Sequence, residues 1–96
     1  MTSEIYRYDF EEVVPTEEIE ASLLLAVWTC EALHGEAQVR LDAAHFFDVA
    51  ERKCVIDANT AVGRDLNKLF VAFLRREYGE DAFQVRRVAK SPAVAA

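Results

Sequence analysis

The stretch ASLLLAVWTC, residues 21–30, is the most apolar run in the chain and lies inside a longer helical pattern. Thr16 is the expected N-cap, and three glutamates follow it in the first turn, where the helix dipole favours negative charge. The helix is predicted to run to about His34, because Gly35 supplies a typical C-terminal stop. A surface helix on a small domain needs only one apolar face, so this run raises the question of what covers it.

Four segments around this helix alternate between apolar and polar residues, as strands with one buried side do. In residues 4–14, Tyr6, Tyr8 and Phe10 fall on one face and charged residues on the other. Further strands are predicted over residues 37–43, with Val39 and Leu41 facing inward, over residues 53–58, with Cys54 and Ile56 on one side, and over residues 82–88.

Residues 43–52 contain neither glycine nor proline, and two interpretations of this segment stay open. The segment forms either a short helix or the extension of a strand that turns around Val49 to Arg52. The hairpin is favoured, because the segments on both sides are strand-like.

A second helix is predicted over residues 59–79, capped by Asn59 or Thr60 and ended by Gly79. Its apolar residues share one stripe: Val62, Leu66, Leu69, Phe70 and Phe73. Its outward face carries Arg64, Asn67, Lys68 and Arg75, with Val71 as the single apolar exception.

The elements therefore follow the order strand, helix, strand, strand, helix, strand. Right-handed crossovers place both helices on one face of a four-stranded antiparallel sheet, which is the two-layer ferredoxin-like α+β arrangement. We expect one compact domain over residues 1–89 and a disordered tail over residues 90–96.

Charge is distributed unevenly within the net charge of −6. Residues 1–20 hold seven acids and one base, residues 21–51 five and one, and residues 52–96 five acids and nine bases. An acidic chain disfavours nucleic acid as a partner, since binding to phosphates depends on lysine and arginine. The segregation of charge favours pairing between the two halves, within one chain or between two, although an ordinary solvated surface has the same composition.

The sequence shows neither a long uncharged apolar stretch nor the basic and then apolar pattern of a signal peptide, so no membrane partner and a cytoplasmic location are expected. Cys30 and Cys54 lie inside apolar runs, which favours buried free thiols over a disulfide or a zinc site.

A helical wheel separates the first helix into two apolar faces. Ile19, Leu23, Ala26 and Cys30 form a stripe that faces the sheet. The opposite side carries Ala21, Leu24, Leu25, Trp28 and Ala32. Either this second face is an interface, or Leu24 and Trp28 belong to the core. They would do so if the helix is rotated, or if it rests against the second helix and residues 43–52.

The sequence contains only weak candidates for catalytic or ligand-binding motifs. Residues 55–66 combine a strand end, a loop and a helix start, but they match no nucleotide-binding pattern, and Gly63 is better explained by close packing. His34 lies in the last turn of the first predicted helix, where the helix dipole favours positive charge. If the loop folds back, His45 joins Asp42 and Asp48 in a carboxylate and imidazole cluster suited to a metal or to acid–base work, and Asp57 on the next strand completes the candidate polar cluster Asp42, His45 and Asp57.

The open face of the predicted sheet is expected to be polar, carrying Arg7, Asp9, Arg40, Asp42, Lys53, Asp57, Gln84 and Arg86. RNA-binding sheets of this architecture present aromatic side chains there, and here Tyr6 and Tyr8 are needed in the core. RNA binding is therefore disfavoured unless these two tyrosines point to solvent.

The resulting hypothesis is a small non-catalytic interaction domain without a cofactor, which forms a homodimer through the outer face of its first helix, with a larger protein as a possible further partner. The alternative is a small-ligand sensor or a metal-dependent enzyme that uses residues 42–57, with Asp42, His45 and Asp57 as its polar groups.

Overall fold

The computed structural model describes residues 4–88, so the predicted tail over residues 90–96 lies outside the described residues. Four strands, three helices and one 3-10 turn follow one another in the order β1 (Ile5–Phe10), α1 (Thr16–His34), α2 (Glu36–Asp42), β2 (His45–Asp48), β3 (Lys53–Asp57), α3 (Ala61–Tyr78), η1 (Glu80–Ala82) and β4 (Phe83–Val88).

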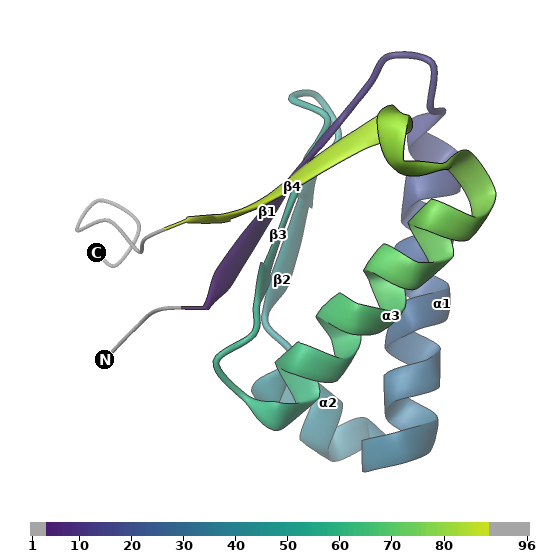
Figure 1. Cartoon of the computed structure of the whole chain (residues 1–96). Helices are drawn as coiled ribbons and strands as arrows, with labels where there is room; N and C mark the ends of the chain where they lie inside the picture. The colour runs from purple at the N-terminus through teal and green to yellow at the C-terminus, as the bar shows by residue number, and fades with distance from the viewer. Residues whose placement is uncertain (1–3, 89–96) are drawn as a thin grey trace.

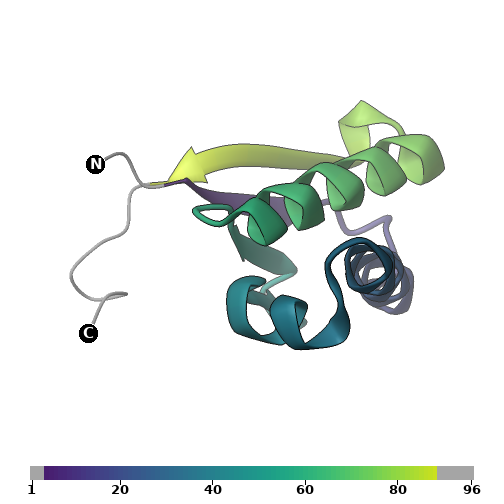
Figure 2. The same cartoon turned by 90° about the horizontal axis from the view of Figure 1, so that it is seen from below.

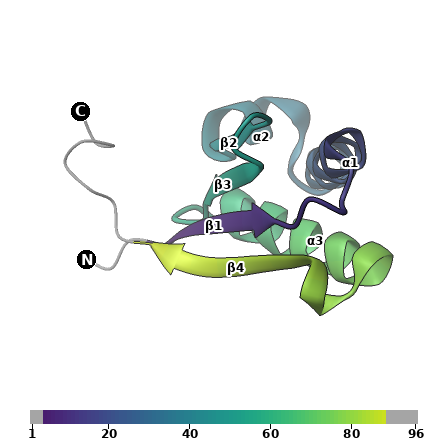
Figure 3. The same ribbon diagram turned by 90° about the horizontal axis from the view of Figure 1, so that it is seen from above.

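The strands form one antiparallel sheet in the order β2-β3-β1-β4. Tyr8 lies opposite Cys54 on one side and Val85 on the other, so these three side chains share a face. Both long helices pack against that face (Figure 1). Figure 3 looks along the sheet and shows α1 beside its β2–β3 half and α3 beside its β1–β4 half. The α+β class and the four-stranded antiparallel sheet are therefore as predicted.

A third helix corrects the predicted order of elements. Residues 37–43 were expected to form a strand with Val39 and Leu41 facing inward, but Glu36–Asp42 is helical. Val39 is buried and Leu41 is 79% exposed, because residues two apart point in different directions on a helix. Arg40 pairs with Glu36 one turn away, which supports the helix locally. Four alternating apolar residues, two of them alanines, are too few to distinguish a strand period from a helix period.

The favoured hairpin over residues 43–52 is correct, although its first strand begins only at His45. Residues 49–52 form the turn, and Arg52 adopts a left-handed conformation with a φ of 55°. The guanidinium of Arg52 donates hydrogen bonds to the backbone carbonyls of Glu11 and Val14, while its own carbonyl accepts from the Phe10 amide. Arg52 thus ties the hairpin turn to the loop that leads into α1.

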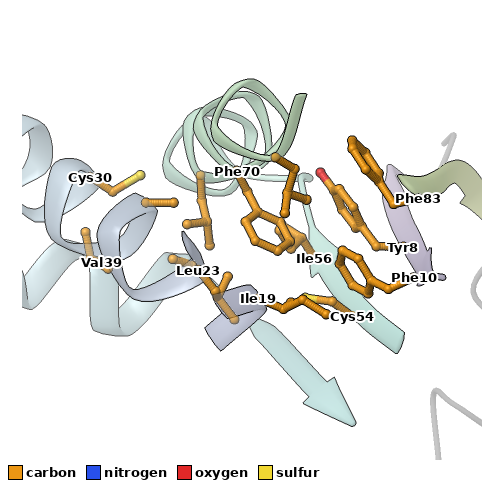
Figure 4. Close-up of a cluster of buried hydrophobic side chains, with 14 of the residues drawn as sticks. Tyr8, Phe10, Ile19, Leu23, Cys30, Val39, Cys54, Ile56, Phe70 and Phe83 are labelled. Atoms are coloured by element: carbon orange, nitrogen blue, oxygen red, sulfur yellow. The ribbon is translucent and has the colours of Figure 1, made fainter. Parts of the chain in front are cut away.

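The core lies between the helix-facing side of the sheet and the inner stripes of α1 and α3 (Figure 4). Tyr8 is fully buried, with its ring centroid 4.9 Å from that of Phe70. Its hydroxyl donates a hydrogen bond to the side-chain oxygen of Asn67 on α3. Burial is the largest cause that raises the pKa of Tyr8, so the phenol remains a neutral donor.

The start of α3 explains the glycine that the sequence places there. Thr60 caps the helix by accepting a hydrogen bond from the Gly63 amide, and its hydroxyl also donates to the Asp42 carbonyl at 2.6 Å. A Cβ on Gly63 would lie 2.1 Å from the Asp57 carbonyl oxygen. Only glycine allows α3 to begin this close to the end of β3.

Gly63→Ala is therefore expected to lower the free energy of unfolding by at least about 2 kcal/mol, because backbone must move to admit the methyl group. Urea titration followed by circular dichroism measures the loss. Lys68→Ala, at an exposed position of the same helix, is the matched control and should change stability by less than about 0.5 kcal/mol. Equal stabilities for wild type and Gly63→Ala would contradict the close approach.

Candidate functional site

The first helix buries only the stripe that it turns toward the sheet. Ile19, Ala26 and Cys30 are fully buried, and Leu23 nearly so. On the opposite side, Leu24 is 46% exposed, Leu25 48% and Trp28 58%, and Ala21 and Ala32 are exposed as well. The alternative in which Leu24 and Trp28 belong to the core is therefore wrong for this chain. Whether the exposed face is an interface remains a prediction.

The other long helix, α3, has no comparable set of exposed apolar residues. Its buried residues form one stripe with Leu66, Phe70 and Leu74, and its outward positions are mostly charged, as predicted. Asn67 departs from that prediction, because it is half-buried and holds the Tyr8 hydroxyl. Of the two long helices, only α1 therefore has an apolar outer face, and no element within residues 4–88 covers it.

Two shallow grooves run along the flanks of this exposed face. One lies between α1 and α3, encloses about 430 Å³, and has Leu25 and Phe73 among its lining residues. Figure 2, which looks along α1, shows the two helices side by side there. The other lies between α1 and the edge strand β2, encloses about 400 Å³, and is lined by Glu20, Leu23, Leu24, Val27, His45, Phe46 and Phe47. The exposed face therefore continues on one side to the sheet edge, where the side chains of His45 and Phe47 lie on the helix side.

Acidic residues surround the N-terminal end of the exposed face. Glu17, Glu18 and Glu20 are all exposed in the first turns of α1. Burial, followed by the negative charges of Glu18 and Glu77, raises the pKa of Tyr78 at the end of α3. Any partner that approaches this end of the helix meets negative charge.

The predicted polar cluster is not assembled. His45 pairs with Ile56 in the sheet, so its side chain lies on the helix side, whereas Asp57 is one residue further along β3 and points to the open face. His45 Nδ1 lies 2.8 Å from the Ala43 carbonyl oxygen, and the Asp57 carboxylate accepts hydrogen bonds from Asn59. The Asp42 carboxylate accepts from Gln38 on its own helix. Within residues 4–88, no group of three or more histidine, cysteine and acidic side chains is arranged to hold a metal ion.

His34 has a partner that the sequence did not indicate. Its Nε2 lies 2.7 Å from an Asp65 carboxylate oxygen, which joins the end of α1 to α3. The sequence suggested only that a histidine suits a helix C-terminus, since nothing in the spacing of residues 34 and 65 reveals their contact. This pair is part of the packing between the helices.

The open face of the sheet differs from the prediction at two positions. Arg40 and Asp42 lie on α2 and not on a strand. The register places Phe46, Val55 and Arg7 in one row across β2, β3 and β1, so one exposed aromatic side chain does lie there. Tyr6 and Tyr8 point to the helix side, so the exception that would favour RNA binding does not arise.

Comparisons with protein-family models, with curated proteins and with solved structures found no match for this chain. Among residues 4–88, none of the helices combines the length and the hydrophobicity that a bilayer crossing requires.

Both cysteines are free and buried, and burial raises the pKa of Cys54 to about 12. We therefore expect iodoacetamide to alkylate neither thiol measurably at pH 8 in the native protein, because the thiolate is the reactive form. Mass spectrometry after timed exposure measures this, and the same protein in urea should react at both positions. Rapid native alkylation of Cys54 would contradict its position in the core.

The raised pKa of Cys54 also predicts that the folded protein is less stable at alkaline pH. The raised folded pKa means that stability is complete below the ordinary thiol value of 9.0 and falls as pH rises toward 12, because the unfolded chain ionises first. The free energy of unfolding should fall by up to about 1.4 kcal/mol per pH unit through this thiol. Denaturation at pH 8 and pH 10.5 tests this, with Cys54→Ala expected to show a shallower decline.

Proposed function

We propose that this protein is a non-catalytic interaction module that forms a homodimer through the exposed face of α1. The observation that carries the proposal is Trp28, which is 58% exposed one turn after Leu24 and Leu25, themselves each nearly half exposed. Contiguous large apolar side chains are unusual on a monomer surface and common at interfaces, where tryptophan is also enriched. A second copy is the simplest partner, since the same face then covers itself.

The apolar area is consistent with self-association. A full aromatic side chain buries about 150 to 250 Å², so the exposed parts of Leu24, Leu25 and Trp28 offer roughly 300 Å² on each copy. Covering this area on two copies contributes about 15 kcal/mol at 25 cal/mol per Å². Association itself costs about 4 to 15 kcal/mol, so these three side chains support a dimer, and further contacts are needed for a tight one.

We also propose that the domain is a variant of the ferredoxin-like arrangement with α2 as an addition. Support comes from the central position of β1 and β3 in the sheet and from the two long helices on one face. This architecture hosts enzymes and oligomerisation modules alike, so it carries no functional argument by itself. A cytoplasmic location and a larger protein partner remain predictions from the sequence.

The alternative function, a sensor or enzyme using Asp42, His45 and Asp57, finds no supporting observation in the described residues. The side chains of His45 and Asp57 lie on opposite sides of the sheet, and each polar group has a local partner. Acid–base or metal chemistry needs such groups to converge on one point.

Trp28→Glu is expected to convert a dimer into a monomer, because it places a charge at the centre of the buried face. Light scattering coupled to size-exclusion chromatography measures the mass directly. The matched control is Leu41→Glu on α2, which places the same charge at a position that is 79% exposed and outside the face.

The control should keep the mass of the wild type, and both variants should keep its circular dichroism spectrum. A wild type that is monomeric at high micromolar concentration, or a Trp28→Glu variant with the mass of the dimer, would refute the proposed function.

A further inference from the structure

The flank of α1 that faces β2 carries a line of residues with an acid at each end. Glu20, Leu24, Val27 and Glu31 are separated by four, three and four residues, so they lie on one side of the helix. The first three line the groove toward β2. Neither glutamate forms an ion pair within residues 4–88. This flank therefore offers two separated negative charges with apolar side chains between them.

The outward side of α3 carries the opposite charges in a similar line. Lys68, Ala72 and Arg76 follow one another at intervals of four residues, and all three are exposed. The other two arginines of this helix form ion pairs within the chain. Lys68 and Arg76 form none in the described part of the chain, so both cations are available to a second molecule.

The two lines lie at similar levels of the helix layer. The helices α1 and α3 run in opposite directions (Figure 1). His34 contacts Asp65, and Leu25 lines the same groove as Phe73. Counting along both helices from these contacts puts the two cations level with about residues 31 and 23 of α1. They lie on the far side of α1 from the two acids, and the width of that helix, about 10 Å, keeps the charges apart within one copy.

The orientation of a second copy decides which flanks meet. In a twofold pair of α1 helices that run in opposite directions, like flanks come together, so α3 would lie beside α3 and cations beside cations. In a twofold pair that runs in the same direction, unlike flanks come together and every residue keeps its level. The helix α3 of one copy then lies over the flank of α1 that faces β2 in the other.

We infer that the α1 helices of the dimer run in the same direction and that α3 of each copy covers the groove between α1 and β2 of the other. Lys68 then meets Glu31 of the second copy, and Arg76 meets Glu20. This inference rests on the proposed function and adds to it the orientation and a second contact, which neither copy can make alone.

The spacing of the charges fits this contact. Glu20 and Glu31 are about 16 Å apart along α1, and Lys68 and Arg76 about 12 Å apart along α3, at 1.5 Å per residue. Lysine and arginine side chains are long enough to span a difference of about 4 Å. Ala72 lies between the two cations, so the apolar residues of the flank meet a small side chain there.

The same orientation brings the N-termini of both α1 helices to one end of the dimer. Glu17 lies about 16 Å along the helix from Trp28, so helices that cross at Trp28 by 20° or more hold the two Glu17 positions at least about 10 Å apart. That distance exceeds the Debye length of about 8 Å, and Arg76 of the second copy lies at the same end. At the crossing the two tryptophans meet, which is a favourable aromatic pair.

Area also favours a contact that includes α3. The large side chains on the outer face of α1 offer roughly 300 Å², about half of the roughly 600 Å² that each partner contributes to the smallest standard interfaces. The two charged lines are about 12 to 16 Å long and one helix, about 10 Å, wide, so they add roughly 300 Å² on each copy. The helix α3 thus supplies the area that α1 alone lacks.

Two charge-reversed variants test the contact. The base-reversed variant is Lys68→Glu/Arg76→Glu, and the acid-reversed variant is Glu20→Lys/Glu31→Lys. Each should raise the dimer dissociation constant at least about tenfold, because both symmetry-related contacts then join like charges. An equimolar mixture should return to within about threefold of the wild type, since the heterodimer joins acid to base at both contacts. Dilution in analytical ultracentrifugation measures all three constants.

The matched control is Arg64→Glu/Arg75→Glu, which makes the same change of charge on the same helix at two arginines that are paired within their own copy. Its dissociation constant should stay within about threefold of the wild-type value. All variants should keep the circular dichroism spectrum of the wild type.

The outcomes separate this inference from the proposed function. A base-reversed variant that dimerises like the wild type or like the control, or a mixture no tighter than its components, would overturn the contact between α3 and α1. Either result leaves the dimer in place if Trp28→Glu still abolishes it. A Trp28→Glu variant of unchanged mass removes both proposals.

Discussion

The helix layer of this domain is one helix thick, and this constraint governs the rest of the structure. A helix in such a layer can bury only the stripe that it turns toward the sheet. The helix α3 obeys the constraint, since its inner stripe is apolar and its outer positions are mostly charged. The helix α1 has the same inner stripe but carries two leucines and a tryptophan outside. The proposed dimer follows from this mismatch between two helices in equivalent positions.

The irregular parts of the chain determine what lies beside that outer face. Because Glu36–Asp42 is a helix and not a strand, β2 is limited to four residues and begins at His45. Between this short edge strand and α1 lies a groove, with Phe47 on the strand side of it. Arg52 holds the hairpin turn against the loop into α1, so the two walls of the groove are tied together at one end.

The polar residues illustrate how a sequence pattern can mislead. Asp42, His45 and Asp57 are close along the chain or across the hairpin, yet the alternation of the strands points His45 and Asp57 to opposite sides. His34 and Asp65 are far apart in sequence and meet because α1 and α3 pack side by side. Proximity in sequence therefore predicted a cluster that is not formed, and the contact that is formed left no signal in the spacing.

The sequence by itself determined the elements with long or clear patterns. The alternation around Tyr8, the glutamate-rich start of α1, the Thr60 cap and the glycines after both long helices all specify local structure through nearest neighbours. The wheel of α1 put Trp28 opposite the predicted core stripe but left open whether the helix is rotated to bury it. Only the tertiary structure decided the state of residues 37–43, because one buried valine packs equally well from a short helix or a strand and the choice depends on the space between α1 and α3. It likewise decided that Leu24 lies across a groove from β2, since the distance between a helix and a sheet edge depends on the packing of the whole layer and not on any local pattern.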